Sequence, residues 1–145
     1  MKAWPGSRGA RIARPPGLLT EMGWGVEPEG LTWMLQRVAG EHPGVPIMVC
    51  ENGAAYVDVV GPDGLVHDLA RTEYVKSHIE AIRLAIEAGA DVRGYFLWSL
   101  LDNFEWARGY AKRFGIVRVD YDSMARTLKQ SGLWYRDFLA GRATT

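Results

Sequence analysis

The stretch that decides the fold is Pro46-Ile47-Met48-Val49-Cys50-Glu51-Asn52-Gly53. Small and apolar residues typical of a buried strand end at Cys50, a carboxylate follows at Glu51, and a turn-forming pair comes next. In folds with parallel strands, side chains at the carboxyl ends of the strands face the ligand crevice. The position of Glu51 therefore predicts a functional carboxylate. The alternative is a solvated acid that opens an ordinary loop.

A helix and a second strand follow this stretch. The helix is predicted over residues 68–88, where apolar residues recur at spacings of three and four: Val75, Ile79, Ile82 and Ile86. Asp68 is placed to cap its start. The second strand is predicted over residues 92–98. Strand, helix and strand with a short return predict a βαβ unit with parallel neighbours, so Glu51 and Trp98 should lie at the same rim.

Three further elements flank the βαβ unit. A helix is predicted over residues 28–39, stopped by Gly40, with an apolar stripe of Leu31, Leu35 and Val38. A short strand is predicted over residues 116–119. A last helix over residues 129–140 is expected to bury Trp134 and Phe138. Only two strong parallel strands are visible, and parallel strands need cover on both faces, so the predicted sheet is incomplete.

Domain organisation is simple. Residues 1–19 are rich in proline, glycine and basic side chains without periodicity, which predicts an irregular N-terminal arm. Residues 20–145 are expected to form one α/β domain. With 145 residues the chain is shorter than a complete eight-fold β/α barrel, which needs about 250.

The charge balance bears on possible partners, and the single cysteine bears on the cellular compartment. The formal net charge is zero, so nothing favours a nucleic acid or an anionic membrane surface. Cys50 is the single cysteine, so an intrachain disulfide is impossible and a cytoplasmic protein is expected. The sequence contains no signal-peptide pattern and no apolar stretch long enough to span a bilayer.

No metal and no cofactor are expected. His42, His67 and His78 lack the spacing that gathers metal ligands. His78 lies beside the apolar stripe of a helix, where a packed histidine is the simpler interpretation. Glycine-rich phosphate loops and serine-centred nucleophile elbows do not occur.

The segment after the second strand combines large aromatic residues with carboxylates. It reads Trp98-Ser99-Leu100-Leu101-Asp102-Asn103-Phe104-Glu105-Trp106-Ala107-Arg108-Gly109-Tyr110. Such a loop at the rim of a sheet favours a ligand, and a sugar suits it, because sugars stack on indole faces and hydrogen-bond to carboxylates. A packed loop with a buried tryptophan is the alternative.

From residue types alone, Glu51 and Glu105 could be the paired carboxylates of a glycosidase. One would act as the nucleophile and the other as the general acid. Such pairs lie about 5–5.5 Å apart in retaining enzymes and about 6.5–9.5 Å apart in inverting ones, a distance that a sequence does not give.

The motifs resemble those of the family 1 glycoside hydrolases, which include the β-glucosidases. Val49-Cys50-Glu51-Asn52-Gly53 is similar to the family's nucleophile motif, with cysteine where threonine is usual. The loop from Trp98 to Tyr110, followed by Arg113-Phe114-Gly115, is similar to the family's sugar-binding loop. Met22-Gly23-Trp24 and Pro28-Glu29-Gly30-Leu31 fit the segment that precedes the nucleophile. The resemblance covers roughly residues 4–140, in the family's order.

The resemblance implies a role for each matching residue. Glu51 matches the nucleophile that forms a glycosyl-enzyme intermediate, and Glu105 matches a residue that binds sugar hydroxyls, not the acid/base. The remaining matches are Trp98 as a stacking platform, Trp106 as a hydroxyl donor, Phe114 in the pocket wall and Trp24 on the aglycone side. Relatives that cleave 6-phosphorylated sugars have serine at the position of Glu105 and tyrosine at that of Phe114, and only Lys112 agrees with their pattern. A carboxylate at residue 105 would repel a phosphate, so a non-phosphorylated β-glucoside-like sugar is expected.

One family motif does not occur. The acid/base glutamate of the family lies in a Thr-x-Asn-Glu-Pro motif on an earlier strand, and this chain contains none. The resemblance therefore implies the C-terminal part of a (β/α)8 TIM barrel, about the last two strands and their helices. The expected function is that of the nucleophile-bearing segment of a retaining β-glucosidase, inactive by itself. The alternative is a non-catalytic sugar-binding or complementing fragment that docks with the missing N-terminal barrel portion.

Overall fold

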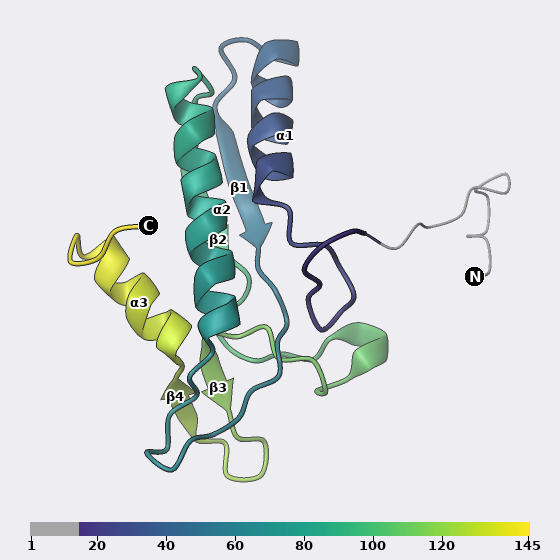
Figure 1. The fold of residues 1–145 in the computed structure, drawn as a ribbon, viewed down its shortest axis with the longest axis vertical. Helices are drawn as coiled ribbons and strands as arrows, with labels where there is room; N and C mark the ends of the chain where they lie inside the picture. Colours follow the sequence, from purple (N-terminus) through teal and green to yellow (C-terminus); the bar gives the residue numbers. More distant parts are fainter. Residues whose placement is uncertain (1–14) are drawn as a thin grey trace, which may run out of the picture.

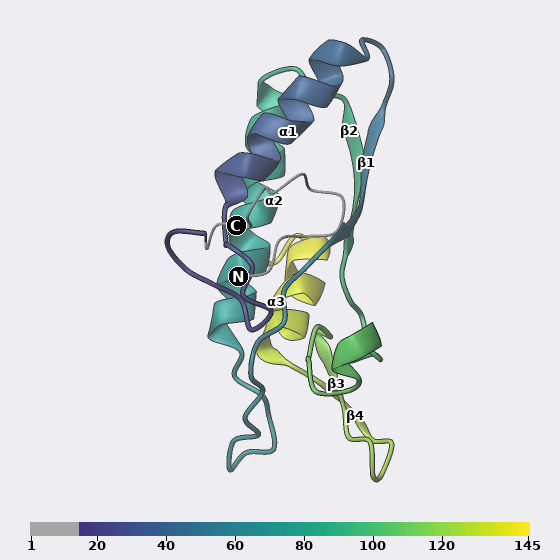
Figure 2. The same cartoon turned by 90° about the vertical axis from the view of Figure 1, so that its right-hand side faces the viewer.

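The structure, a computed structural model, describes residues 15–145. Its elements follow the chain as α1 (Pro28–Glu41), β1 (Ile47–Asn52), α2 (Leu69–Glu87), β2 (Val92–Leu97), the 3-10 helix η1 (Trp106–Arg108), β3 (Val117–Val119), β4 (Arg126–Leu128) and α3 (Gln130–Leu139). Figure 1 shows α1 and α2 running alongside the two long strands. In Figure 2 both helices lie on one side of β1 and β2.

The predicted βαβ unit is confirmed. β1 and β2 pair in parallel, with α2 between them in sequence. A core cluster joins this sheet to α1 and α2, and its buried members are Leu35, Val49, Ile82, Ala85 and Ala90. A second cluster, built around Ala54, Tyr74 and Val75, packs Trp134 of α3 against α2. Trp134 and Phe138 are half-buried, and their rings stack with centroids 5.3 Å apart.

The opposite face of the two strands is exposed in the part of the chain that the structure describes. Met48 of β1 is 49% exposed and Phe96 of β2 is 55% exposed. Parallel strands with helices on one face and open apolar side chains on the other form an incomplete sheet, as the sequence predicts. The expectation of a buried strand before Glu51 is wrong for this reason: of its apolar residues only Val49 is buried.

Two predicted element limits and one predicted apolar stripe need correction. α1 does not stop before Gly40, because the His42 N–H still bonds the Val38 carbonyl oxygen at 3.0 Å; the chain reverses at Gly44, where φ is +79°. β1 continues past Cys50 to Asn52. On α2, Ile86 of the predicted stripe is 47% exposed, whereas the neighbouring Ala85 is buried in the same cluster as Leu35 of α1.

The register between β1 and β2 contains one extra residue beside Glu51. The flanking pairs are Val49 with Tyr95 and Asn52 with Leu97. Two residues of β1, Cys50 and Glu51, therefore lie opposite Phe96 alone. A bulge of this kind bends the strand and changes the direction of the side chains that follow it.

Asp68 has a different role from the predicted one. It is the residue before α2, but its side chain does not cap that helix. Its Oδ1 instead accepts a hydrogen bond of 2.8 Å from the backbone N–H of Ser131, in the first turn of α3. A carboxylate at a helix start satisfies free N–H groups and complements the helix dipole. Asp68 thereby caps the helix 63 residues further along the chain.

A short hairpin directly precedes α3. β3 pairs antiparallel with β4, a strand that the sequence patterns did not predict. β3 itself corresponds to the strand predicted over residues 116–119. The proposed irregular arm of residues 1–19 falls largely on residues 1–14, outside the described part, so it and the domain limit at residue 20 stay predictions.

Candidate active site

A pocket of about 550 Å³ opens at the carboxyl ends of β1 and β2. Its lining comes from segments far apart in the sequence: Trp24, Glu51, Asn52, Gly53, Tyr74, Trp98, Glu105, Trp106 and Phe114. All six side chains that the sequence analysis selected for binding or catalysis are among them. The structure therefore brings these six together, and their individual roles stay predictions.

The bulge in β1 determines the direction of Glu51. Strict alternation along the strand would place Glu51 on the same face as Val49, which is buried against the helices. Because of the extra residue, Glu51 is instead exposed and lines the pocket. A carboxylate in this position can reach a ligand in the pocket.

Asn52 holds the end of β1 on both sides. Its side-chain Oδ1 accepts a hydrogen bond of 3.0 Å from the Tyr95 hydroxyl of β2. Its Nδ2 donates to the Tyr74 hydroxyl of α2 at 3.3 Å. Its backbone oxygen accepts from the Trp98 N–H at 2.9 Å. The backbone next to Glu51 is thereby linked to β2, α2 and the start of the following loop.

The pocket loop, residues 98–115, presents Glu105 on a tight turn. The Glu105 N–H donates to the Gly109 carbonyl oxygen at 2.7 Å, which closes the turn around η1. Asn103 Nδ2 lies 3.4 Å from Glu105 Oε2, and the Ser99 hydroxyl donates to Asn103 Oδ1 at 3.2 Å. Trp106, which follows Glu105, has a positive φ of 41° and is 83% exposed. The turn therefore brings a carboxylate and an indole side chain, next to each other in the sequence, to the same pocket.

Aromatic rings form the walls of the pocket. Phe114 is almost fully buried, and the Trp24 ring lies over it with a centroid distance of 6.0 Å and an interplanar angle of 47°. Trp98 is partly exposed and supplies a further face. Indole and phenyl faces next to carboxylates can both stack on a sugar ring and hydrogen-bond its hydroxyls.

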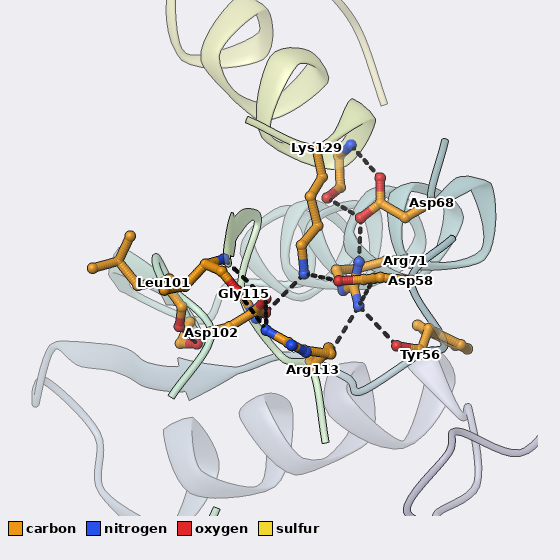
Figure 3. A network of polar contacts seen from close by, with 12 residues as sticks. Tyr56, Asp58, Asp68, Arg71, Leu101, Asp102, Arg113, Gly115 and Lys129 are labelled. Atoms are coloured by element: carbon orange, nitrogen blue, oxygen red, sulfur yellow. Dashed lines mark hydrogen bonds and ion pairs between the residues drawn. The ribbon is translucent and has the colours of Figure 1, made fainter. Parts of the chain in front are cut away.

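A buried charge cluster that was not predicted from the sequence links the pocket loop to α2 and to the start of α3 (Figure 3). It pairs three carboxylates with three cations: Asp58, Asp68 and Asp102 with Arg71, Arg113 and Lys129. Charges taken out of water need partners, and here the formal charges balance. The clue in the sequence was the i, i+3 spacing of Asp68 and Arg71 at the start of a helix.

Arg71 connects the segment after Glu51 to the pocket loop. Its side chain is 1% exposed, and its guanidinium donates to the carbonyl oxygens of Ala54 and Tyr56, each at 3.3 Å, and of Arg113 at 2.7 Å. Arg113 directly precedes Phe114 of the pocket wall. The cluster therefore joins the backbone that carries Glu51 to the backbone that carries Phe114.

Asp102 joins the pocket loop to β3 and to the start of α3. Its fully buried carboxylate accepts from the N–H of Gly115 at 3.0 Å and from the N–H of Val119 at 3.2 Å. It also pairs with Arg113 at 3.0 Å and with Lys129 at 2.8 Å. Burial, with the nearby Arg71 charge second, lowers the pKa of the Lys129 ammonium. The carboxylates of Asp102 and Asp58 oppose this shift, because each accepts a hydrogen bond from the Lys129 ammonium.

Some further features bear on the expected ligands. Within residues 15–145, the structure has no group of three or more His, Cys, Asp or Glu side chains that could hold a metal ion. No helix in the described part is long and apolar enough to cross a membrane. His78 is buried and stacks on Tyr74 at 3.9 Å, with its Nδ1 2.7 Å from the Tyr74 carbonyl oxygen. The interpretation of His78 as a packed residue is confirmed.

Parallel strands with helices on one face and a pocket at their carboxyl ends define a part of a β/α barrel. The family 1 β-glucosidase from Thermotoga maritima has this arrangement: its structure matches with a TM-score of 0.88 and 47% identity, over 92% of this chain and 30% of that one. Residues 8–143 match the family model Glycosyl hydrolase family 1, and the chain belongs to this family of glycosidases.

Curated relatives give the same result. β-Glucosidase A of Thermotoga maritima is 53% identical over 116 residues, which are 80% of this chain and 26% of that protein. A bifunctional β-D-glucosidase/β-D-fucosidase of Bifidobacterium breve is 50% identical over 140 residues, 94% of this chain and 30% of that protein. The Thermotoga maritima enzyme has also been solved in complex with glucoimidazole. The chain therefore spans less than a third of the length of these relatives.

Proposed function

We propose that the chain is the nucleophile-bearing part of a retaining β-glucosidase-type hydrolase, with Glu51 as the nucleophile. The observation that carries the proposal is the direction of Glu51: the bulge in β1 turns this carboxylate into a pocket that also contains Trp98 and Glu105. A carboxylate among stacking rings and hydroxyl acceptors suits attack on a bound sugar.

The reaction would proceed in two steps. A Glu51 carboxylate oxygen attacks the anomeric carbon, and the bond from that carbon to the leaving oxygen breaks. A second carboxyl group, from residues outside these 145, protonates the leaving oxygen. The same group then takes a proton from a water molecule, which attacks the anomeric carbon and releases Glu51. Two inversions give overall retention of configuration.

The other pocket residues would bind the glycone and the aglycone. Glu105 would accept hydrogen bonds from sugar hydroxyls, and Trp106 would donate one from its indole N–H. Trp98 would stack on the sugar face, Phe114 would close the wall, and Trp24 would contact the aglycone. A phosphorylated glycone is disfavoured because its charge would lie near the Glu105 carboxylate.

Chemical rescue tests the role of Glu51. The chain is combined with the part of Thermotoga maritima β-glucosidase A that lies outside the matched segment, and hydrolysis of 4-nitrophenyl β-glucoside is measured. Glu51→Ala should lower kcat on the order of 10³-fold or more. Azide should restore 4-nitrophenol release and give the α-glycosyl azide, because it attacks from the face that Glu51 has vacated.

Glu87→Ala is the matched control, since Glu87 is an exposed carboxylate on α2 paired with Arg83. It should keep the activity of the parent. A Glu51→Ala variant that retains activity, or a rescued product of β configuration, would remove Glu51 from the role of nucleophile.

The exposed apolar face of the sheet favours a second candidate function. Met48 and Phe96 lie open on that face, which suits docking with further barrel strands. The chain would then act as a complementing fragment that binds sugar but does not itself perform catalysis. Activity of the combined polypeptides that survives Glu51→Ala would favour this candidate.

A further inference from the structure

The segment that carries Trp24 forms a small hairpin, residues 18–26, which we call the Trp24 hairpin. Leu19 and Gly25 form a bridge across it. The Trp24 carbonyl oxygen accepts a hydrogen bond of 2.8 Å from the Thr20 N–H, and the Trp24 N–H donates to the Thr20 hydroxyl at 3.3 Å. These contacts shape the hairpin but do not determine where it lies on the rest of the molecule.

Glu21 attaches the hairpin to two segments beside the pocket, the segment after Glu51 and the pocket loop. Its backbone N–H donates to the Ala55 carbonyl oxygen at 2.9 Å, four residues beyond Glu51. Its Oε1 accepts from Lys112 Nζ of the pocket loop at 2.7 Å. Among the described residues, both hydrogen bonds between residues 18–26 and the rest of the chain come from Glu21.

The ion pair is placed to influence geometry more than stability. The side chains of Lys112 and Glu21 are 19% and 26% exposed, so the pair is partly solvated. Partly exposed ion pairs contribute little to the free energy of folding, whereas a charge-assisted hydrogen bond this short has a defined direction. Lys112 lies two residues before Phe114, the ring on which Trp24 packs.

We propose that Glu21 is a positioning residue, which through Lys112 and the Ala55 carbonyl holds Trp24 as the aglycone-side wall of the pocket. The effect of Glu21 on catalysis rests on the proposed function, because Trp24 matters to turnover only if the pocket binds a glycoside. The effect of Glu21 on the position of Trp24 does not depend on the proposed function. Loss of the pair lets the hairpin move away from Phe114 while the core below stays folded.

Fluorine NMR of the 145-residue chain labelled with 5-fluorotryptophan tests the position of Trp24 directly. The chain has six tryptophans, and Trp24→Phe assigns the resonance of interest. Glu21→Gln and Glu21→Lys should each shift or broaden the Trp24 resonance and leave those of Trp33, Trp98, Trp106 and Trp134 unchanged. The double reversal Glu21→Lys with Lys112→Glu should restore it, because the two side chains exchange ends of the same bridge.

Asp91→Asn is the matched control, since it removes a carboxylate from an exposed ion pair with Arg93 at the amino end of β2. It should leave all six resonances in place. The positioning role is overturned if the Trp24 resonance is the same in wild type and Glu21→Gln, or if the double reversal fails to restore it. Should Glu21→Lys unfold the chain, Glu21→Gln decides the matter.

Kinetics of the combined polypeptides separate this proposal from the previous one. Glu21→Gln should raise KM for a β-glucoside with a large aromatic aglycone roughly threefold to tenfold and change kcat less than about twofold. A fall in kcat with KM unchanged would contradict the positioning role. If Glu51→Ala shows that the proposed function is wrong, the NMR result still tests the position of Trp24.

Discussion

Gly53 packs directly against the backbone of Trp98: a Cβ on residue 53 would overlap the Trp98 carbonyl oxygen. The turn after Glu51 and the start of the pocket loop therefore meet backbone to backbone. The Trp98 N–H also donates to the Asn52 carbonyl oxygen at 2.9 Å. The absence of a side chain at Gly53 allows the two parts of the pocket to approach this closely.

Gly53→Ala should destabilise the chain. A methyl group that overlaps a backbone oxygen cannot be accommodated without backbone movement, so we expect a loss of about 3 kcal/mol or more in the free energy of unfolding. Urea denaturation followed by tryptophan fluorescence measures it. Gly40→Ala is the control: this glycine lies on α1, where a Cβ would meet no heavy atom within 4 Å apart from the local backbone of the helix, and alanine should stabilise by about 0.5–1 kcal/mol. Equal stabilities for the two variants would contradict the close approach.

Asp102→Asn should be among the most destabilising single changes in the buried charge cluster. The carboxylate has no solvent exposure and pairs with both Arg113 and Lys129. Its neutralisation leaves Arg113 without a carboxylate partner and leaves Lys129 with Asp58 alone, so the cluster carries an unbalanced positive charge. We expect a loss of about 3–5 kcal/mol in the free energy of unfolding, measured by urea denaturation. Asp91→Asn, at an exposed pair, should have little effect. A small effect of Asp102→Asn would show that water reaches the cluster.

Two histidines should give opposite pH dependences of stability. Burial lowers the pKa of His78 below its ordinary value of 6.5, so the contribution of His78 is fully present above the unfolded pKa and declines as the pH falls through the folded pKa. Hydrogen bonding and charge from Asp63 raise the pKa of His67, so its contribution is present below the unfolded pKa and is lost as the pH rises through the folded pKa.

Urea denaturation at about pH 5.5 and about pH 8 distinguishes them. Loss of stability in His78→Phe should be larger at the higher pH, and loss in His67→Gln should be larger at the lower pH. The same sign of pH dependence in both variants would contradict the assignment of the buried and the exposed histidine.

The 145-residue chain alone should have negligible hydrolytic activity. A retaining cycle needs two carboxyl groups about 5–5.5 Å apart, and the family's acid/base motif does not occur in this sequence. An assay of the purified chain with an aryl β-glucoside checks this. Turnover that Glu51→Gln abolishes would contradict it. Loss of that turnover in Glu105→Gln would then restore Glu105 as the partner carboxylate.

Local patterns in the sequence predicted the parts of the fold that depend on near neighbours. The period of apolar residues in α2 reflects burial of one face, and the apolar run of β1 ends at a turn-forming pair, so they predict a helix and a strand without knowledge of the partners. The order of short motifs also selected Trp24, Glu51, Trp98 and Glu105, which the structure brings into one pocket. Motif order is a property of the chain, so it needs no contact to be recognised.

Only the tertiary structure decided how these residues face one another. The direction of Glu51 depends on an extra residue in the register of β1 with β2, and no property of β1 alone specifies that register. β4 was missed because three residues paired with β3 leave almost no periodicity in the sequence. Asp68 caps a helix 63 residues away, and Glu21 pairs with a lysine 91 residues away. Such contacts form only when packed elements bring charged groups that are distant in the sequence close together and partly remove them from water. The sequence therefore determines which side chains are present, and the packing of the elements determines which of them pair.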